Sequence, residues 1–524
     1  MMDMCGWELL GAGHTVAAWK TALFAVLLVG LITSLAFEEK LHARKSVIAG
    51  FFALICLLLG AVTGVLPFGR VVVGSEPVVP PTKPVEVEIV SEEDGHHEKV
   101  VVGGSARSEH AGQGTPALHV GGHRLDMPVY IPGIDWSVIA IILGSSLFVD
   151  VTSQSGLFTW IAIRATKASG GDPFRLMILY GVMTVVFSAV LNNVTAMIIV
   201  GSLTAVSLDR LGRRDKLLGF LLIEGLLTNV GGLLTLISSV PNIIVGTTAD
   251  ISFVSFFIKA APFVAMATAV TIWLGLRRFG IERLTLAEER EGARRLVAGF
   301  DESDGVASWG FFWFGAAMLV LFIVAIATTS VLPYRINHLG MGFVALLFAG
   351  IMLLPYKSEV DRFYKTVDWD LLGFFMALFV VIYVMEHARV LAAVGSAIEM
   401  VLIDKSFESV QGHKVDATTL LAGSALFSSV TDNIPLSAML ASILKSLGAP
   451  HESGLWWSVV FGANLGGNIT PIGSASTLVA VTLIHKHKLH LSFVEFVKIA
   501  APYALIQLVL AALYVLFILP WIPG

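Results

Sequence analysis

Long apolar segments recur along this chain, and they constrain its fold more than any other feature. About 20 consecutive apolar residues in a helix cross the hydrocarbon core of a bilayer. Only 14% of the residues are charged, whereas a soluble domain carries about 25%. The sequence therefore predicts an all-α polytopic membrane protein with spans near 18–37, 46–67, 134–153, 217–247, 253–276, 308–331, 338–356, 368–387, 455–483 and 491–519.

Two further apolar stretches, 174–208 and 416–447, are interrupted at their centres by polar residues. The interruptions are Leu191-Asn192-Asn193-Val194-Thr195 and Thr431-Asp432-Asn433-Ile434-Pro435. Each flanking arm is short for a full crossing. A polar tip between two short arms predicts a re-entrant hairpin, which is tolerated where protein lines a cavity.

Basic residues surround the first hairpin, whereas the flanks of the second mix acids with fewer bases. Short basic loops stay in the cytoplasm, so we expect the first hairpin to enter from the cytoplasm and the second from outside. The same rule places both termini outside. We expect a multi-pass protein of the cytoplasmic (inner) membrane.

These features divide the chain into six parts. They are the N-terminal helices 1–69, an extracytoplasmic polar loop 70–130, a first repeat 131–276, a cytoplasmic loop 277–307, linking helices 308–356 and a second repeat 357–524. The polar loop holds five of the 14 histidines, His96, His97, His110, His119 and His123. Metal capture and a solvated, partly disordered loop are the two interpretations, and no ligand spacing is recognisable.

The two repeats are inferred from matching sequences in the same order. The segment 252–262 matches 492–502 at seven of eleven positions, an offset of 240. Asn193 and Asn433 share that offset, and the Asn-X-Gly-Gly motifs at 229 and 464 and the Asp-Trp pairs at 135 and 368 follow at 235 and 233. Opposite orientations of the two halves would make an inverted repeat, with the site at mid-depth where broken helices meet.

Each half interrupts its helices twice, at the hairpin tip and at a glycine-rich break in the next span. Glycine and proline free backbone groups, asparagine offers hard oxygen ligands, and half-helix N-termini favour anions. Tight helix packing is the alternative interpretation. The candidate ion- or substrate-binding residues are Asn192, Asn193, Thr195, Asn229, Gly231, Gly232, Ser238, Ser239 and Asn242, followed by Asp432, Asn433, Asn464, Gly466, Gly467, Asn468, Thr470 and Ser474.

Two acids are candidates for proton coupling. Asp432 lies near mid-membrane, where an acid costs roughly 2.5–3.5 kcal/mol and signals function. It could take a proton, bind a cation or cap the second arm of the hairpin. Glu224 lies about two turns into its span, and it is either a buried proton carrier or a helix-packing carboxylate.

These motifs resemble the ion transporter superfamily that contains arsenite permeases (ArsB), NhaD-type sodium–proton antiporters, the melanosomal P protein and divalent anion symporters. The resemblance covers about residues 130–520 and rests on the hairpin tips, on Pro241-Asn242-Ile243-Ile244-Val245-Gly246 and on Gly462-Ala463-Asn464-Leu465-Gly466-Gly467-Asn468. It implies a scaffold domain, a transport domain that moves as an elevator, and a homodimer. It implies no cofactor beyond possible Na⁺ at the hairpin tips.

Two departures from the superfamily pattern bear on the substrate. Asn192 stands where an acid is common, and Ser238-Ser239-Val240-Pro241-Asn242 replaces a Gly-Asp-Pro-Pro-Asn run. We expect an ion-coupled permease for a small inorganic ion, either an arsenite-like oxyanion or Na⁺ exchanged for H⁺. A di- or tricarboxylate symporter and a passive channel are the alternatives. An enzyme is not expected, because metalloprotease and P-loop motifs are missing from the sequence.

Overall fold

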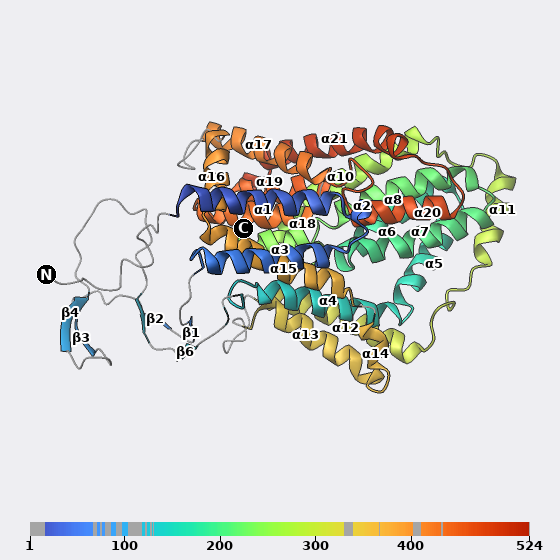
Figure 1. Cartoon of the computed structure of the whole chain (residues 1–524). Helices are drawn as coiled ribbons and strands as arrows, with labels where there is room; N and C mark the ends of the chain where they lie inside the picture. The colour runs from blue at the N-terminus through green and yellow to red at the C-terminus, as the bar shows by residue number, and fades with distance from the viewer. Residues whose placement is uncertain are drawn as a thin grey trace. The chain divides into compact units, whose positions relative to one another are not determined.

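The computed structural model describes residues 16–66, 71–73, 76–78, 85–90, 97–102, 118–120, 123–125, 128, 130–329, 339–365, 367–401, 410–430 and 433–522. The chain forms two compact units (Figure 1), one made of Met1–Val65 with Ile134–Gly524 and the other of Leu66–Gly133. Eight helices in the described residues are long and apolar enough to cross a membrane. The larger unit is therefore a polytopic membrane domain, as predicted.

The described elements of the larger unit are helical throughout. Its first repeat contains α4 (Trp136–Ser153), α5 (Leu157–Ser169), α6 (Pro173–Val190), α7 (Asn193–Arg210), η2 (Arg214–Lys216), α8 (Leu217–Gly231), α9 (Val240–Thr248) and α10 (Phe253–Arg278). Its second repeat contains α14 (Val360–Tyr364), α15 (Trp369–His387), α16 (Val390–Val401), α17 (Val410–Ser428), α18 (Asn433–Ser446), α19 (Gly454–Gly466), α20 (Ala475–Lys486), α21 (Phe493–Phe517) and η6 (Leu519–Trp521). The remaining elements are α1 (Ala18–Ala36), α2 (Glu38–Leu41), α3 (Lys45–Val62), α11 (Ala287–Ala298), α12 (Trp309–Thr328), α13 (Gly340–Leu353) and η5 (Leu354–Tyr356).

The repeated sequence motifs begin helices. Asp135 accepts hydrogen bonds from the amides of the first turn of α4, and Asp368 does the same for α15. Ser252 and Ser492 likewise cap α10 and α21. Such caps satisfy amides that have no partner within the helix, so each matched motif fixes the start of a corresponding helix in each half.

The predicted hairpins and broken helices are observed as helix pairs. α6 and α7 are separated only by residues 191–192, and α17 and α18 flank the second tip. The predicted spans 217–247 and 455–483 are each divided into two helices, α8 with α9 and α19 with α20. At each break the chain leaves helical geometry around a Gly-Gly pair, where helix propensity is low.

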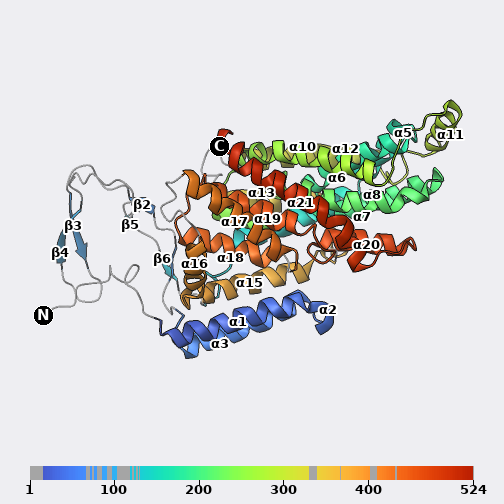
Figure 2. The same cartoon turned by 90° about the horizontal axis from the view of Figure 1, so that it is seen from above.

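Peripheral helices surround these elements. α3 packs against α15, and α13 packs against α4. Figure 2 shows α1 and α3 along one flank of the bundle beside α15. A hydrogen bond of 2.5 Å from the Ser46 hydroxyl to the Asp370 carboxylate joins the start of α3 to that of α15.

The smaller unit contains three two-stranded antiparallel pairs. Its strands are β1 (Val71–Val73), β2 (Glu76–Val78), β3 (Val85–Val90), β4 (His97–Val102), β5 (Leu118–Val120) and β6 (His123–Leu125). β1 pairs with β6, β2 with β5 and β3 with β4. The pairs are nested, so the loop folds back on itself as a ribbon. No strands were expected here from the sequence, and metal capture by the histidines stays a prediction.

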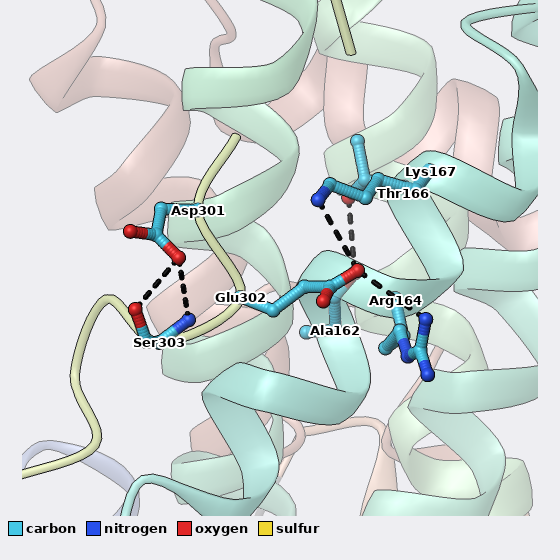
Figure 3. A network of polar contacts seen from close by, with 7 residues as sticks. All are labelled: Ala162, Arg164, Thr166, Lys167, Asp301, Glu302 and Ser303. Atoms are coloured by element: carbon cyan, nitrogen blue, oxygen red, sulfur yellow. Dashed lines mark hydrogen bonds and ion pairs between the residues drawn. The ribbon is translucent and has the colours of Figure 1, made fainter. Parts of the chain in front are cut away.

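Helices α5, α11 and α16 were not predicted. α11 and the segment after it lie in the predicted cytoplasmic loop 277–307. In that segment the Glu302 carboxylate lies 3.4 Å from the Arg164 guanidinium and 3.2 Å from the Lys167 ammonium (Figure 3). Hydrogen bonds from the Ser303 amide and hydroxyl lower the pKa of the neighbouring Asp301 carboxyl. These contacts fasten the loop 299–305 to α5.

Candidate functional site

Two buried asparagines join the two halves of the chain at their helix breaks. The Asn229 amide donates a hydrogen bond of 2.9 Å to the hydroxyl of Ser474, the N-cap residue of α20. In the other half, the Ser239 hydroxyl at the start of α9 donates one of 2.8 Å to the Asn464 amide oxygen. Ser474 and Ser239 differ by 235 positions, as do Asn464 and Asn229. The two contacts are therefore equivalent, with the direction of donation reversed.

The hairpins are fastened to the broken helices by a second equivalent set of hydrogen bonds. The Ser188 hydroxyl donates to the Thr228 carbonyl at 2.6 Å, and the Ser428 hydroxyl donates to the Ala463 carbonyl at 2.5 Å. One residue further, the Thr235 hydroxyl bonds the Ala189 carbonyl at 2.6 Å, and the Thr470 hydroxyl bonds the Ser429 carbonyl at 2.6 Å. The hairpin residues differ by 240 and the break residues by 235, which are the offsets of the sequence motifs.

Contacts at the outer ends show that the two broken helices run in opposite directions. The Arg214 guanidinium, just before α8, donates to the His487 carbonyl, just after α20, at 2.8 Å. The His451 ring, just before α19, lies 2.8 Å from the Ala249 carbonyl, just after α9. The start of each broken helix is thus beside the end of the other.

The hairpins open toward opposite ends for the same reason. α7 packs along α8 and α20, and α18 packs along α19 and α9. α7 therefore leads from its tip to the end marked by His487, whereas α18 leads to the end marked by His451. This is the arrangement that an inverted repeat predicts, and it brings the starts of α7, α9, α18 and α20 toward the centre.

The first hairpin tip contacts this centre through Asn193. Its amide oxygen accepts a hydrogen bond of 2.6 Å from the Ser188 hydroxyl, and its amide nitrogen donates one of 3.2 Å to Asn229. The neighbouring Asn192 caps α7 through the Thr195 amide at 2.7 Å. Asn192 is exposed and Thr195 is half-buried, so both are accessible to a solute.

The second tip is described from Asn433 onward. Thr431 and Asp432 lie outside the described residues, so the predicted roles of Asp432 stay predictions. Asn433 is half-buried at the start of α18, and its carbonyl accepts a hydrogen bond from the Ser437 hydroxyl. Asn433 occupies the position that Asn193 has in the first half.

Other predicted site residues form hydrogen bonds with buried groups of the protein itself. The Asn242 amide donates to the carbonyls of Gly232 and Thr235, and the Ser238 hydroxyl donates to the same two carbonyls. Asn468 accepts from Asn229 and donates to Gln507. All three side chains are at least nine-tenths buried, so the structure places them as supports for the break.

The Gly-Gly pairs at 231–232 and 466–467 have a packing reason in the structure. A Cβ at Gly231 would lie 2.6 Å from the Val185 carbonyl oxygen, and one at Gly466 would lie 2.4 Å from that of Ala425. Gly232 and Gly467 also face close neighbours, the Asn193 amide and the Gly473 carbonyl. At Gly231, Gly232 and Gly466 the hairpin and the broken helix thus approach each other too closely for any side chain, and at Gly467 the two sides of the break do so.

Several polar residues of the site were missed by the sequence analysis. Gln507 in α21 accepts a hydrogen bond from Asn468 and donates one of 2.9 Å to the Thr271 hydroxyl of α10. Ser476 donates to Asn229 at 3.1 Å. The available signal was a lone glutamine in an otherwise apolar span, which in a membrane is expected to have a polar partner.

Glu224 lies in a separate buried polar cluster. It is part of α8, about two helical turns before the break at Gly231. Its side chain is fully buried, and its Oε1 accepts a hydrogen bond of 2.6 Å from the Thr204 hydroxyl of α7. Its Oε2 has no partner among the described residues. One turn along α7, the Ser207 hydroxyl lies 2.8 Å from the Tyr180 hydroxyl, which also contacts Thr166 of α5. The cluster therefore connects α5, α6, α7 and α8.

Two hairpins and two antiparallel broken helices, joined by amides and hydroxyls at their breaks, define a secondary transporter. The chain belongs to the citrate transporter family, whose model matches residues 114–462. An uncharacterized transporter of Mycobacterium tuberculosis is 31% identical over 388 residues, which cover 73% of this chain and 86% of that protein. The 46 kDa membrane protein of Mycobacterium leprae is 30% identical over 389 residues, with the same coverage.

More distant similarities agree with the superfamily predicted from the motifs. The human P protein is 24% identical over 474 residues, which span 76% of this chain and 55% of the P protein. The YdaH transporter of Alcanivorax borkumensis has a similar fold, with a TM-score of 0.55 at 12% identity over 91% of this chain and 99% of that one. The resemblance to this transporter superfamily is thereby confirmed.

Proposed function

We propose that this protein carries an anion with two or three carboxylates and couples its movement to protons. The observation that carries the proposal is the approach of half-helix N-termini at the breaks. The amides of a first helical turn lack intrahelical acceptors, and the helix dipole makes this end positive. Such ends bind carboxylates in transporters with broken helices. Membership of the citrate transporter family supports the same substrate class.

The polar groups that are accessible at the breaks suit an anion. Ser474 is half-buried, Ala475 after it is exposed, and Thr195 is half-buried on α7. Hydroxyls and free amides donate hydrogen bonds to carboxylates. The Asn229 side-chain oxygen, which would suit Na⁺, is already used, since it accepts from Asn193 and Ser476. This argument favours the carboxylate substrate over the small inorganic ion expected first.

Glu224 is the described residue best suited to carry the coupling proton. An ionised carboxylate that is buried without a cation is costly, whereas the neutral acid is tolerated. In the described residues, no lysine or arginine pairs with Glu224, and Tyr180 is the titratable side chain that contacts its cluster. Glu224 would hold a proton while enclosed and release it when hairpin movement admits water. Asp432 stays a second candidate from the sequence alone.

The proposed mechanism is alternating access. Each hairpin would cover the site from one end, because α7 and α18 lead to opposite ends of the domain. A homodimer, the cytoplasmic membrane and extracytoplasmic termini are further proposals, which rest on the superfamily resemblance and on loop charge.

Flux into proteoliposomes tests the proposal. Citrate, succinate, arsenite and Na⁺ are compared as substrates under imposed pH and Na⁺ gradients. We expect uptake of a di- or tricarboxylate that depends on the pH gradient. Transport of arsenite or Na⁺ alone would contradict the substrate, and downhill flux that ignores both gradients would indicate a passive channel.

A further inference from the structure

An apolar groove of about 1110 Å³ lies between α6 and α10. Its walls are mostly apolar and include Ile178, Val182 and Val186 of α6, which are 36%, 46% and 50% exposed. The volume is at the upper end of small-molecule pockets, which are about 300–1,000 Å³. The groove needs an apolar occupant, since water gains no hydrogen bonds from such walls.

One end of the groove is cationic. Arg277 and Arg283 line it there, together with the carboxylate of Glu282. Each guanidinium lies over an aromatic ring of the groove, Arg277 at 4.6 Å from the Trp273 ring centre and Arg283 at 4.5 Å from that of Phe174. Among the described residues neither arginine forms an ion pair. The end therefore presents two oriented cations against one acid.

The groove is long enough to hold a lipid chain, because it is longer than one leaflet is deep. It follows α10 from Arg277 to Ala261, and sixteen residues of α-helix rise about 24 Å. One leaflet of the hydrocarbon core is about 15 Å deep, half of roughly 30 Å. The charged end adjoins the loop after α10, which loop charge assigns to the cytoplasmic face.

From this geometry we infer that the α6–α10 groove binds an anionic phospholipid, with an acyl chain along α6 and its phosphate at Arg277 and Arg283. Basic pockets between membrane helices at the cytoplasmic face bind anionic headgroups. A second copy of the chain fits less well, because a two-fold interface places the same patch on both sides. It would bring the arginines of one copy toward those of the other.

The groove also reaches the transport machinery. Its inner end includes Leu234 in the first helix break and Val185, whose carbonyl adjoins Gly231. A bound acyl chain would therefore contact the first arm of the hairpin. The inference does not depend on the proposed substrate, and its test measures lipid binding instead of flux.

Native mass spectrometry and thermal unfolding of the purified full-length chain test the inference. Phosphatidylglycerol is compared with phosphatidylcholine of identical acyl chains. We expect selective retention of phosphatidylglycerol and a rise in Tm. The variant Arg277→Gln/Arg283→Gln should weaken retention by roughly one order of magnitude or more, given the attraction per basic residue. Arg278→Gln, which removes a charge from the same helix end outside the groove lining, should retain the selectivity.

Two further experiments distinguish a bound lipid from the other possible occupants of the groove. Val182→Trp should reduce retention while leaving both arginines in place, because it fills the groove, and inorganic phosphate should not compete. Equal retention of the two lipids, or an unchanged preference in the double arginine variant, overturns the inference. So does a wild-type dimer that the Val182→Trp variant converts to monomer without change in lipid retention.

Discussion

The side-chain amide of Asn229 donates a hydrogen bond of 2.9 Å to the hydroxyl of Ser474, 245 residues further along the chain. The reciprocal contact, Ser239 to Asn464, spans 225 residues at 2.8 Å. Each half thus supplies an asparagine to the helix start of the other. Neither break is complete within its own half, so the two halves depend on each other for a formed site.

Replacing Asn229 with alanine should destabilise the protein and reduce transport. The change removes the amide that donates to Asn468 and Ser474, and a buried polar group that loses a partner costs about 1–3 kcal/mol in proteins generally. Asn464→Ala should have a similar effect, because it removes the reciprocal contact with Ser239 and the hydrogen bond to Asn242. Thermal unfolding in detergent and citrate flux are the measurements. Ser145→Ala is the control, since Ser145 bonds only carbonyls of its own helix. A loss no larger than that of the control would show that the asparagine cross-links are dispensable.

Gly231→Ala and Gly466→Ala should separate the hairpins from the broken helices. The added methyl carbon would lie 2.6 Å and 2.4 Å from a carbonyl oxygen of the facing helix, so backbone must move. Overpacking of this kind costs typically about 1–3 kcal/mol. Gly423→Ala in α17 is the matched control, because a Cβ there meets no atom within 4 Å and alanine favours the helix. Tm and flux are compared among the three variants, and equal values would contradict the packing role.

Glu224→Gln should abolish proton-driven uptake and leave the protein folded. Glutamine has the same shape and keeps an oxygen that accepts the Thr204 hydrogen bond, but it cannot carry a proton. Substrate exchange without a pH gradient should continue, while uptake driven by the gradient should fall at least about tenfold, as expected for a lost intramembrane proton carrier. Glu302→Gln, in the exposed loop of Figure 3, should leave coupling unchanged. Gradient-driven uptake at the wild-type rate in Glu224→Gln would assign Glu224 to helix packing.

Asp432→Asn should abolish coupled transport without unfolding the protein. The prediction comes from the sequence, in which this acid stands at the tip of the second hairpin and carries a cost that function would explain. Flux and Tm are measured together, with Glu452→Gln as a control acid outside the hairpin. Flux equal to wild type in Asp432→Asn would remove Asp432 from the mechanism, and the separate result for Glu224 would then decide the coupling residue.

Local sequence signals predicted the elements of the site well. The tips at Asn192 and Asn433 and the breaks at Gly231 and Gly466 could be located because polar residues and glycines interrupt long apolar runs. α5 was missed because its run from Leu157 to Ser169 is too short and too mixed to be recognised as a span. The strands of the smaller unit were missed because some paired strands are far apart in the sequence. β1 and β6, for example, lie near opposite ends of the loop.

The roles of individual side chains could not be predicted in this way. Asn229, Asn242, Asn464 and Asn468 were equal candidates for ligands in the sequence, and the structure uses them largely to join helices. Whether an amide binds a solute or a neighbouring carbonyl depends on which groups lie within about 3 Å of it. That distance is a property of the packed halves and not of the motif.

The sequence by itself determined that the chain crosses the membrane, where its helices break and that its two halves are related, because hydropathy and helix propensity are local properties of successive residues. Tertiary structure alone decided that Asn229 meets Ser474, that one Glu224 oxygen has no partner among the described residues and that Arg277 and Arg283 line one end of an apolar groove. These relationships require residues distant in the sequence to be brought together by helix packing, and nothing in a single segment specifies its neighbour.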